Sequence, residues 1–352
     1  MLQFTLSQQL NTHPFTFAAT GIRVYSFEEL LYHAYHYWRE SADDVFSDTM
    51  AAWLLDLGHA AQANQLKELR KITSFAKRMA AFLQLMPYFN DEEIAAVSDD
   101  LKRWESRREW EQLKERGDQF LTRNDPAKAA PLYRRALQFE ENVPLLNNLA
   151  VALMRLDANT EALRLLQRAR TMEPHNPTLT LHYAEAAILS RQFDRAQDAL
   201  NQAAQSLAPR DTQAAADIAY LQGLMAFEQN DCPAALAFFQ SAQQQNDQIP
   251  LYTIKISDAL LKMRQYDQAL QALAHYPTPD EDFYTQQVKI HTAAGNVPQA
   301  VRAIKQALEH SNSAALWTHL AACYRRDYDF ARADEAIAKA LTIDPHNEAA
   351  RL

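Results

Sequence analysis

The stretch SAALWTHLAACYRRDYDFARADEAIAKALTIDPHN, residues 313–347, decides how the whole chain is interpreted. It contains two alanines seven residues apart, Ala333 and Ala340. The same pair recurs upstream as Ala129 with Ala136, Ala162 with Ala169, Ala196 with Ala203, Ala235 with Ala242, and Ala300 with Ala307. One more unit, the fifth of seven in chain order, keeps Ala269 but has Tyr276 at the second position. Because successive units begin about 34 residues apart, the stretch is the last member of a series of repeats.

The spacing of small and large residues predicts two antiparallel helices in each unit. Alanine allows the two helices to approach closely, and the larger apolar residues fill the neighbouring spaces. One such unit cannot bury its own apolar face, so neighbouring units are expected to stack and share a continuous core.

The region from about Trp110 to Asn347 resembles seven tetratricopeptide repeats. The last repeat carries the residues of the family pattern at Trp317, Leu320, Ala321, Tyr324, Ala333, Ala340 and Pro345. The first repeat carries them at Leu113, Gly117, Phe120, Ala129, Tyr133 and Ala136, while the fifth and sixth repeats are degenerate. The resemblance implies an all-α fold with a right-handed α-α superhelix (the TPR solenoid), and we expect an N-terminal helical bundle before it. We expect the bundle at residues 1–100 and the solenoid at residues 101–352.

The first hundred residues lack the repeat and are predicted to form a small bundle of about four or five helices. Ser26 with Glu29 and Asn90 with Glu93 have the spacing of capping boxes at two helix starts. The segment PFTFAATGIRVY, before the first of these helices, is expected to be extended. The opening also resembles the N-terminus of a group of uncharacterised bacterial repeat proteins, which favours a bacterial and cytoplasmic protein.

Composition and charge argue against several classes of function. The five glycines are widely separated, so neither a P-loop nor a Rossmann phosphate-binding loop can form. A net charge of −9 argues against nucleic-acid binding, which needs clustered positive charge. Two distant cysteines favour a reducing compartment, and no apolar run predicts a signal peptide or membrane insertion.

One cluster could hold a metal ion, because Glu29, His33 and His36 share a helix face. The alternative is an amphipathic, aromatic-rich helix whose histidines cap it or face solvent, and this alternative is favoured because no second cluster supplies more ligands. Cys232 and Cys323 are interpreted as small packed residues. We therefore predict no catalytic residue, no metal and no cofactor, and a protein that is not an enzyme.

The segment LKRWESRREWEQLKER, residues 101–116, mixes basic and aromatic residues, a combination that can bind nucleic acid. Acidic residues alternate with the basic ones at helical spacing, however. This pattern favours a solvated, salt-bridged helix that joins the two domains.

In tetratricopeptide repeat proteins the first helix of each repeat lines a concave groove, where ligands usually lie. The resemblance therefore implies a partner-binding groove with an apolar strip that suits an amphipathic helix or an extended peptide. The apolar residues at groove positions are Val151, Met154, Leu181, Ile188, Tyr220, Leu224, Phe227, Leu251 and Ile254. The flanking polar residues are Asn147, Arg155, Glu185, Asp258 and Lys262. For each of them the alternative is that it packs against the next repeat.

Some members of the family grip a C-terminal carboxylate with a Lys-Asn-Asn-Lys-Arg clamp. This chain keeps Lys114 and Asn148 at two of the matching positions and has Asp118, Thr178 and His182 at the others. Because an acid in the clamp would repel a carboxylate, we do not expect binding to chaperone tails.

The leading hypothesis is a non-enzymatic scaffold or adaptor whose partner is another protein or peptide bound in the groove. The alternative is a peptide-sensing regulator, in which a ligand in the groove repositions the N-terminal bundle. Homo-oligomerisation is left open.

Overall fold

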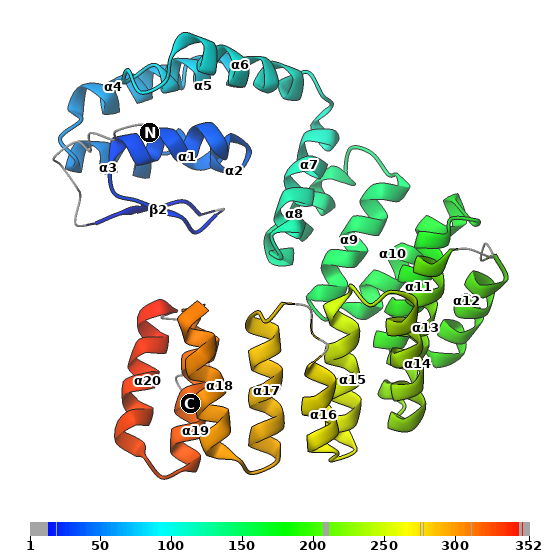
Figure 1. The fold of residues 1–352 in the computed structure, drawn as a ribbon. Helices are drawn as coiled ribbons and strands as arrows, with labels where there is room; N and C mark the ends of the chain where they lie inside the picture. Colours follow the sequence, from blue (N-terminus) through cyan, green and yellow to red (C-terminus); the bar gives the residue numbers. More distant parts are fainter. Residues whose placement is uncertain are drawn as a thin grey trace. The chain divides into compact units, whose positions relative to one another are not determined.

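The computed structural model describes residues 13–18, 20–206, 211–274, 276, 278–310, 312–344 and 347. The chain divides into two compact units, Met1–Met172 and Glu173–Leu352, called here the N-terminal and C-terminal units. Both are built almost entirely of helices (Figure 1), which confirms the predicted all-α class. In the described parts of the chain, no helix is long and apolar enough to cross a membrane.

The N-terminal unit contains a short β-hairpin in the segment that was expected to be extended. Strands β1 (Phe15–Thr16) and β2 (Arg23–Val24) pair antiparallel. Gly21, between them, has a φ of 71°, a left-handed conformation that glycine adopts without a steric penalty. Phe17 is fully buried and belongs to the core of the helices that follow, so the hairpin is part of the bundle.

Six helices lie between residues 27 and 105, a stretch that is described without gaps, compared with the four or five predicted. They are α1 (Phe27–His36), α2 (Trp38–Val45), α3 (Asp48–Asp56), α4 (Ala60–Leu69), α5 (Phe75–Leu83) and α6 (Asp91–Glu105). The extra helix arises at Tyr37, whose backbone (φ −126°, ψ 38°) leaves the helical region and separates α1 from α2. The core of the bundle includes Phe27, Leu30, Met79 and Phe82, all fully buried.

One of the two predicted capping boxes is complete. At the start of α6, the Asn90 side chain accepts the N–H of Glu93 at 2.9 Å, and the Glu93 carboxylate accepts the N–H of Asn90 at 2.8 Å. At the start of α1, Ser26 Oγ accepts the N–H of Glu29 at 3.2 Å, as predicted. The Glu29 carboxylate, however, accepts the N–H of Tyr25 at 2.6 Å, so it bonds the residue before the cap.

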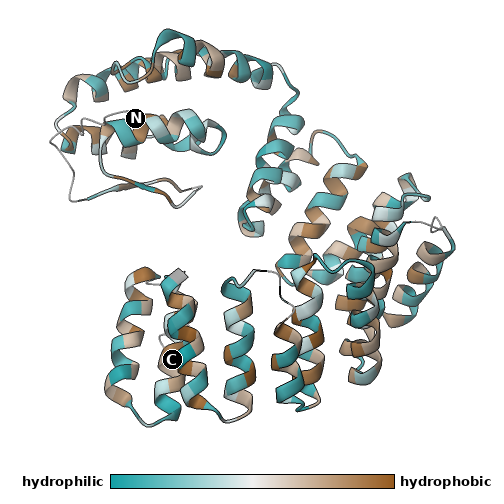
Figure 2. Ribbon diagram, viewed as in Figure 1, coloured by the Kyte–Doolittle hydropathy of each residue, from teal (hydrophilic) through white to brown (hydrophobic). Residues whose placement is uncertain are grey.

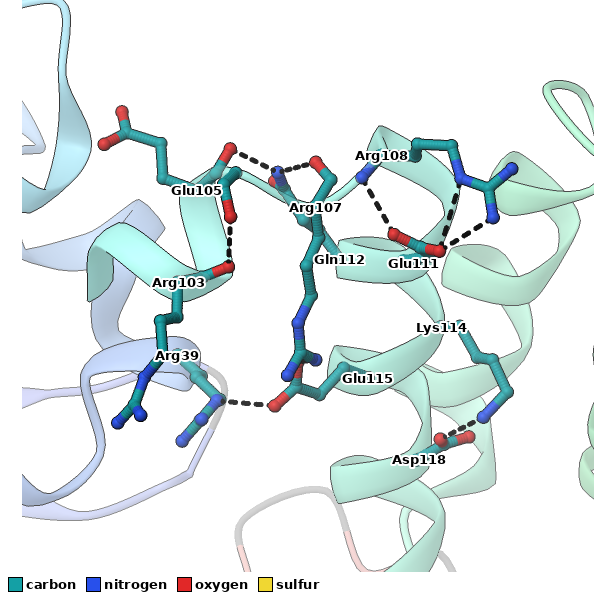
Figure 3. A network of polar contacts seen from close by, with 11 residues as sticks. Arg39, Arg103, Glu105, Arg107, Arg108, Glu111, Gln112, Lys114, Glu115 and Asp118 are labelled. Carbon is teal, nitrogen blue, oxygen red and sulfur yellow. Dashed lines mark hydrogen bonds and ion pairs between the residues drawn. The ribbon is translucent and has the colours of Figure 1, made fainter. Parts of the chain in front are cut away.

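The charged segment at residues 101–116 is broken, although a single helix was predicted. Helix α6 ends at Glu105, and α7 (Glu109–Thr122) begins after a short turn. The Gln112 side chain closes the break by donating to the backbone oxygens of Glu105 (3.4 Å) and Arg107 (2.9 Å) (Figure 3). Ion pairs between residues three apart form on both sides of the break, as predicted. The domain division proposed at residue 100 falls inside α6 and stays a prediction.

Seven helical hairpins occupy the described residues between 109 and 343, as predicted. In the N-terminal unit, α7 pairs with α8 (Pro126–Ala136), and α9 (Val143–Arg155) with α10 (Asn159–Met172). In the C-terminal unit the pairs are α11 (Pro177–Leu189) with α12 (Phe193–Ser206), α13 (Thr212–Glu228) with α14 (Cys232–Gln245), α15 (Pro250–Lys262) with α16 (Tyr266–Leu273), α17 (Glu281–Ala293) with α18 (Val297–His310), and α19 (Ala314–Arg326) with α20 (Phe330–Ile343). Hydrophobic and hydrophilic residues alternate along the hairpin helices (Figure 2), as expected when one face of each is buried.

Small residues lie where the two helices of a hairpin cross. The repeated alanines are all buried, none more than 6% exposed. In two hairpins the first helix also carries a glycine at the crossing. A Cβ atom on Gly117 would lie 2.7 Å from the Tyr133 ring, and one on Gly223 would lie 2.6 Å from the Phe239 ring. Both rings are fully buried, so the close packing of these two hairpins requires glycine, which has no side chain, at these positions.

A residue in the left-handed conformation marks the turn inside every hairpin. In chain order these residues are Asn124, Asp157, Arg191, Asn230, Arg264, Gly295 and Tyr328, with φ between 57° and 77°. A left-handed residue directly after a helix satisfies the last carbonyl groups and ends the helix. Only one of the seven is glycine, so the residue types do not indicate this left-handed turn, although it recurs in every repeat.

Candidate functional site

The histidines of α1 serve the core and the surface of the bundle. His33 is buried, its ring centroid lies 4.1 Å from that of Phe17, and its Nε2 is hydrogen-bonded to Thr20 Oγ1 at 3.3 Å. His36 is exposed, while the Glu29 carboxylate accepts the N–H of Tyr25. His33 therefore differs from the predicted solvent-facing histidine. The described residues contain no group of three or more His, Cys, Asp or Glu side chains that could hold a metal ion.

Three of the positions compared with the carboxylate clamp, and a neighbouring tyrosine, meet in the N-terminal unit. Lys114 Nζ lies 2.6 Å from Oδ2 of Asp118 (Figure 3). Asn148 Nδ2 and the Tyr133 hydroxyl both donate to Oδ1 of Asp118, each at 2.8 Å. Asp118 thus occupies the donors that a ligand carboxylate would need. This arrangement supports the expectation that no carboxylate binds there.

The other charged side chains at the start of α7 are paired with one another (Figure 3). Glu115 forms ion pairs with both Arg39, at 3.0 Å, and Arg107. Arg108 pairs with Glu111 at 2.9 Å. A cavity of about 780 Å³ lies beside these groups, but its lining mixes both signs of charge. Each acid of the lining, namely Glu111, Glu115 and Asp118, is already paired with a basic side chain.

The residues predicted to line the groove all lie on the first helices of hairpins. In the N-terminal unit, Asn147, Val151, Met154 and Arg155 lie on α9. In the C-terminal unit, Leu181, Glu185 and Ile188 lie on α11, Tyr220, Leu224 and Phe227 on α13, and Leu251, Ile254, Asp258 and Lys262 on α15. Their role in binding a partner stays a prediction.

Three of these residues are core residues instead of surface residues. Met154 is 8% exposed, Leu224 is 6% exposed, and Ile188 is completely buried. The reason is geometric: on one helix, the positions that face a groove adjoin those that pack against a neighbouring helix. We therefore leave these three side chains out of the candidate site.

Three predicted polar residues hold neighbouring hairpins together. Arg155 donates to a backbone carbonyl near the end of α7 at 2.9 Å, and Lys262 donates to one near the end of α13 at 3.2 Å. A cation at a helix C-terminus is favourable because the helix dipole is negative there. Asp258 accepts a hydrogen bond from the buried Gln286 at 2.6 Å. These contacts give all three a structural role.

Four of the predicted residues meet in a pocket of the C-terminal unit with a volume of about 370 Å³. They are Leu181, Glu185, Tyr220 and Leu251. The complete lining is Thr178, Leu181, His182 and Glu185 from α11, Asp217, Tyr220 and Leu221 from α13, and Ile249, Leu251 and Tyr252 at the start of α15. We call it the α11–α13–α15 pocket, since the first helices of three successive hairpins build it.

The predicted groove residues did not include four polar members of this lining, namely Thr178, His182, Asp217 and Tyr252, although Thr178 and His182 had been compared with the carboxylate clamp. On α11 the lining residues have the spacing i, i+3, i+4 and i+7, which is one complete face of a helix. Extending each predicted groove position by three or four residues would have found His182 from Glu185 and Asp217 from Tyr220.

A chain of hydrogen bonds holds Asp217 in the pocket wall. Asn246 Nδ2, at the end of α14, donates to Gln213 Oε1 at 2.7 Å. Gln213 Nε2 then donates to Asp217 Oδ1 at 2.8 Å, and the Tyr252 hydroxyl also bonds this carboxylate. Burial raises the pKa of Asp217 above its ordinary value.

Two tyrosines form an aromatic wall beside Asp217. The Tyr220 ring centroid lies 5.7 Å from that of Tyr252 and 5.9 Å from that of the fully buried Phe239. Burial, and then the charge of Glu185, raise the pKa of Tyr220, and burial raises the pKa of Tyr252 to about 12. Both phenols are therefore protonated at neutral pH.

The charge of the pocket is negative. Burial lowers the pKa of His182, although nearby Asp217 partly opposes this effect, so the imidazole is neutral at pH 7. The lining contains two carboxylates, Glu185 and Asp217, and neither lysine nor arginine. The lining also offers an exposed apolar side chain, because Leu251 is 43% exposed.

Family models match the repeat region at three places. Models described as tetratricopeptide repeat match residues 157–219, residues 114–177 and residues 285–348. No curated protein matches the chain.

Several solved structures are also similar to this chain. A tetratricopeptide repeat protein from Parabacteroides merdae is 19% identical over 69% of this chain and 96% of its own, with a TM-score of 0.48. The C-terminal part of a TPR repeat-containing protein from Cytophaga hutchinsonii is 16% identical over 67% and 96%, with a TM-score of 0.40. A chain of the Cut9–Hcn1 hetero-tetramer of the APC/C is 15% identical over 93% and 62%, with a TM-score of 0.45. At these identities and scores we carry no function over from them.

Proposed function

Since the chain is a tetratricopeptide repeat protein, we propose that it is a non-catalytic adaptor that binds a segment of a partner protein in the α11–α13–α15 pocket. Proteins of this family generally bind other proteins and are generally not catalytic. The finer assignment rests on one observation: side chains from the first helices of three successive hairpins converge on one cavity of about 370 Å³.

The lining of the pocket suits a peptide segment. Binding sites are typically concave and mainly apolar, with a few polar groups that fix the orientation of the ligand. Here Leu181 and Leu251 supply apolar surface, and Tyr220 supplies a rigid aromatic anchor. The pocket lies at the lower end of the usual range of about 300–1,000 Å³. It has room for one or two side chains of a segment, which places the remaining contacts outside it.

Affinity measurements on a pocket variant test this proposal. Peptides of sixteen residues would be selected from a displayed random library against the full chain, and synthetic copies would be titrated by fluorescence anisotropy. The variant Leu181→Ala/Leu251→Ala removes apolar contact area from the pocket. We expect it to weaken binding by about tenfold or more, which corresponds to about 1.4 kcal/mol.

A matched variant controls for non-specific effects. Phe238→Ala removes an apolar side chain of similar exposure (36%) from α14, outside the pocket. This variant should bind the selected peptides like the parent chain, and all three proteins should show equal helicity by circular dichroism. If the pocket variant binds every selected peptide as tightly as the parent chain does, the pocket is not the binding site and the proposal is wrong.

A further inference from the structure

We propose that the α11–α13–α15 pocket receives a basic side chain, arginine or lysine, of the partner segment. This inference rests on the proposed function and adds the chemical class of the group that is recognised. The charge, the aromatic wall and the fixed geometry of the pocket all favour a cation.

The charge of the pocket selects the sign of the ligand. Glu185 from α11 and Asp217 from α13 bring two carboxylates to one small cavity, and the lining contains no basic side chain besides the neutral His182. An anionic group would be repelled by both carboxylates. A purely apolar group would bury them further and add no hydrogen-bond donor, which is unfavourable. A cationic group, in contrast, is attracted to both carboxylates.

The aromatic wall favours a cation as well. A guanidinium or ammonium group is attracted to the face of a tyrosine ring, by about 0.5–2 kcal/mol depending on its exposure to water. Tyr220 is the partly exposed ring of this wall, and its centroid lies 5.7 Å from that of Tyr252, which is only 2% exposed and supports it. The same structure shows this kind of contact elsewhere in the C-terminal unit, where Lys262 Nζ lies 3.9 Å from the Phe227 ring centroid.

The Asp217 carboxylate is held in a fixed position before any ligand binds. Gln213 and Tyr252 fix its carboxylate with hydrogen bonds from two different helices, and Asn246 fixes Gln213 in turn. A carboxylate offers about four acceptor sites, so acceptor capacity remains for a ligand donor. A group held in place in advance loses little entropy on binding, which raises affinity.

The apolar part of the pocket matches the stem of such a side chain. Arginine and lysine carry three or four methylene groups between the backbone and the charge, and these groups bury readily along apolar surfaces. Leu181 and Leu251 provide that surface beside the carboxylates. A long basic side chain can therefore contact leucine along its stem, and the two acids and Tyr220 with its charged head.

The test compares a charged peptide with an almost isosteric neutral one. Among the selected peptides that bind through the pocket, as judged by Leu181→Ala/Leu251→Ala, each arginine would be replaced in turn by citrulline and each lysine by acetyl-lysine. At one position the neutral peptide should bind the parent chain at least about tenfold more weakly. The same replacement should cost less than about threefold in Glu185→Gln/Asp217→Asn, because the carboxylates that recognise the charge are absent.

The control variant is Asp198→Asn, which removes an exposed carboxylate of α12 outside the pocket. It should keep the full discrimination between the charged and neutral peptides. The inference is overturned, and the proposed function stands, if pocket-dependent peptides contain no basic residue or if their neutral analogues bind equally well. If no selected peptide depends on the pocket, the proposed function itself fails and this inference fails with it.

Discussion

Replacing Gly223 by alanine tests how the hairpin behind the pocket is packed. A Cβ atom at this position would lie 2.6 Å from both Cδ1 and Cε1 of Phe239, where ordinary contacts begin at 3.4 Å. Phe239 is fully buried, and its ring contacts Tyr220 on the same wall, so it has no open space to move into. The two helices, α13 and α14, must therefore separate or the ring must leave its preferred rotamer.

The expected magnitude is the difference of two opposing effects. Overpacking a buried site typically costs about 1–3 kcal/mol, and an overlap of this size belongs in the upper half of that range. Alanine recovers about 1 kcal/mol because it favours the helix more than glycine does. We therefore expect Gly223→Ala to lower the free energy of unfolding by about 1–2 kcal/mol. The midpoint of thermal unfolding should fall by about 2–8 °C, at about 2–4 °C per kcal/mol for a domain of this size.

Urea unfolding followed by circular dichroism would measure the loss, and a second substitution would identify its cause. In a Phe239→Leu background the overlap is relieved, so adding Gly223→Ala should cost little or even stabilise the chain. The coupling between the two sites then equals the overpacking energy. If Gly223→Ala alone is as stable as the parent chain, the ring moves aside freely and the packing argument is refuted.

Two further predictions concern the N-terminal unit. Burial, assisted by the charge of Arg123, lowers the pKa of His33 from its ordinary value of 6.5 to about 4. Between pH 6.5 and about 4, therefore, the His33 imidazole takes up a proton in the unfolded chain but not in the folded chain. Acidification over this range should lower the free energy of unfolding by up to about 3 kcal/mol. In urea titrations at a series of pH values, His33→Asn should lose this part of the pH dependence, and equal slopes in both proteins would contradict the assignment. Asp118→Ala leaves the buried Tyr133 hydroxyl without its acceptor and should cost about 2–3 kcal/mol, while Asp118→Asn should cost less. A loss below about 0.5 kcal/mol in the alanine variant, which is typical of surface substitutions, would contradict the role given to this carboxylate.

The repeat architecture was predictable because it depends on local patterns that recur along the chain. The alanines that define the period are all buried at the helix crossings, and the degenerate fifth unit still buries Tyr276 at the position where alanine is missing. Helix starts were also readable from local chemistry, as at Asn90 and Glu93. The left-handed turn residues were not readable, since Arg264 and Tyr328 adopt a conformation that their side chains disfavour.

The structure places the predicted groove residues in different surroundings. Leu181, Glu185, Tyr220 and Leu251 meet in one pocket, whereas Ile188 and Leu224, one turn further along their helices, are buried. A change of one helical turn, or a small rotation about the helix axis, moves a side chain from a surface to an interface. The periodicity of a sequence does not specify that rotation, because it is set by how neighbouring hairpins pack.

The sequence by itself therefore determined the helical class, the number of hairpins and the bounds of the repeats along the chain. The tertiary structure alone decided which side chains of those helices meet. Asp217 and Tyr252 are 35 positions apart, and nothing local links them. They hydrogen-bond across one pocket because the first helices of successive hairpins lie side by side, and that stacking gives the pocket its negative charge and its aromatic wall.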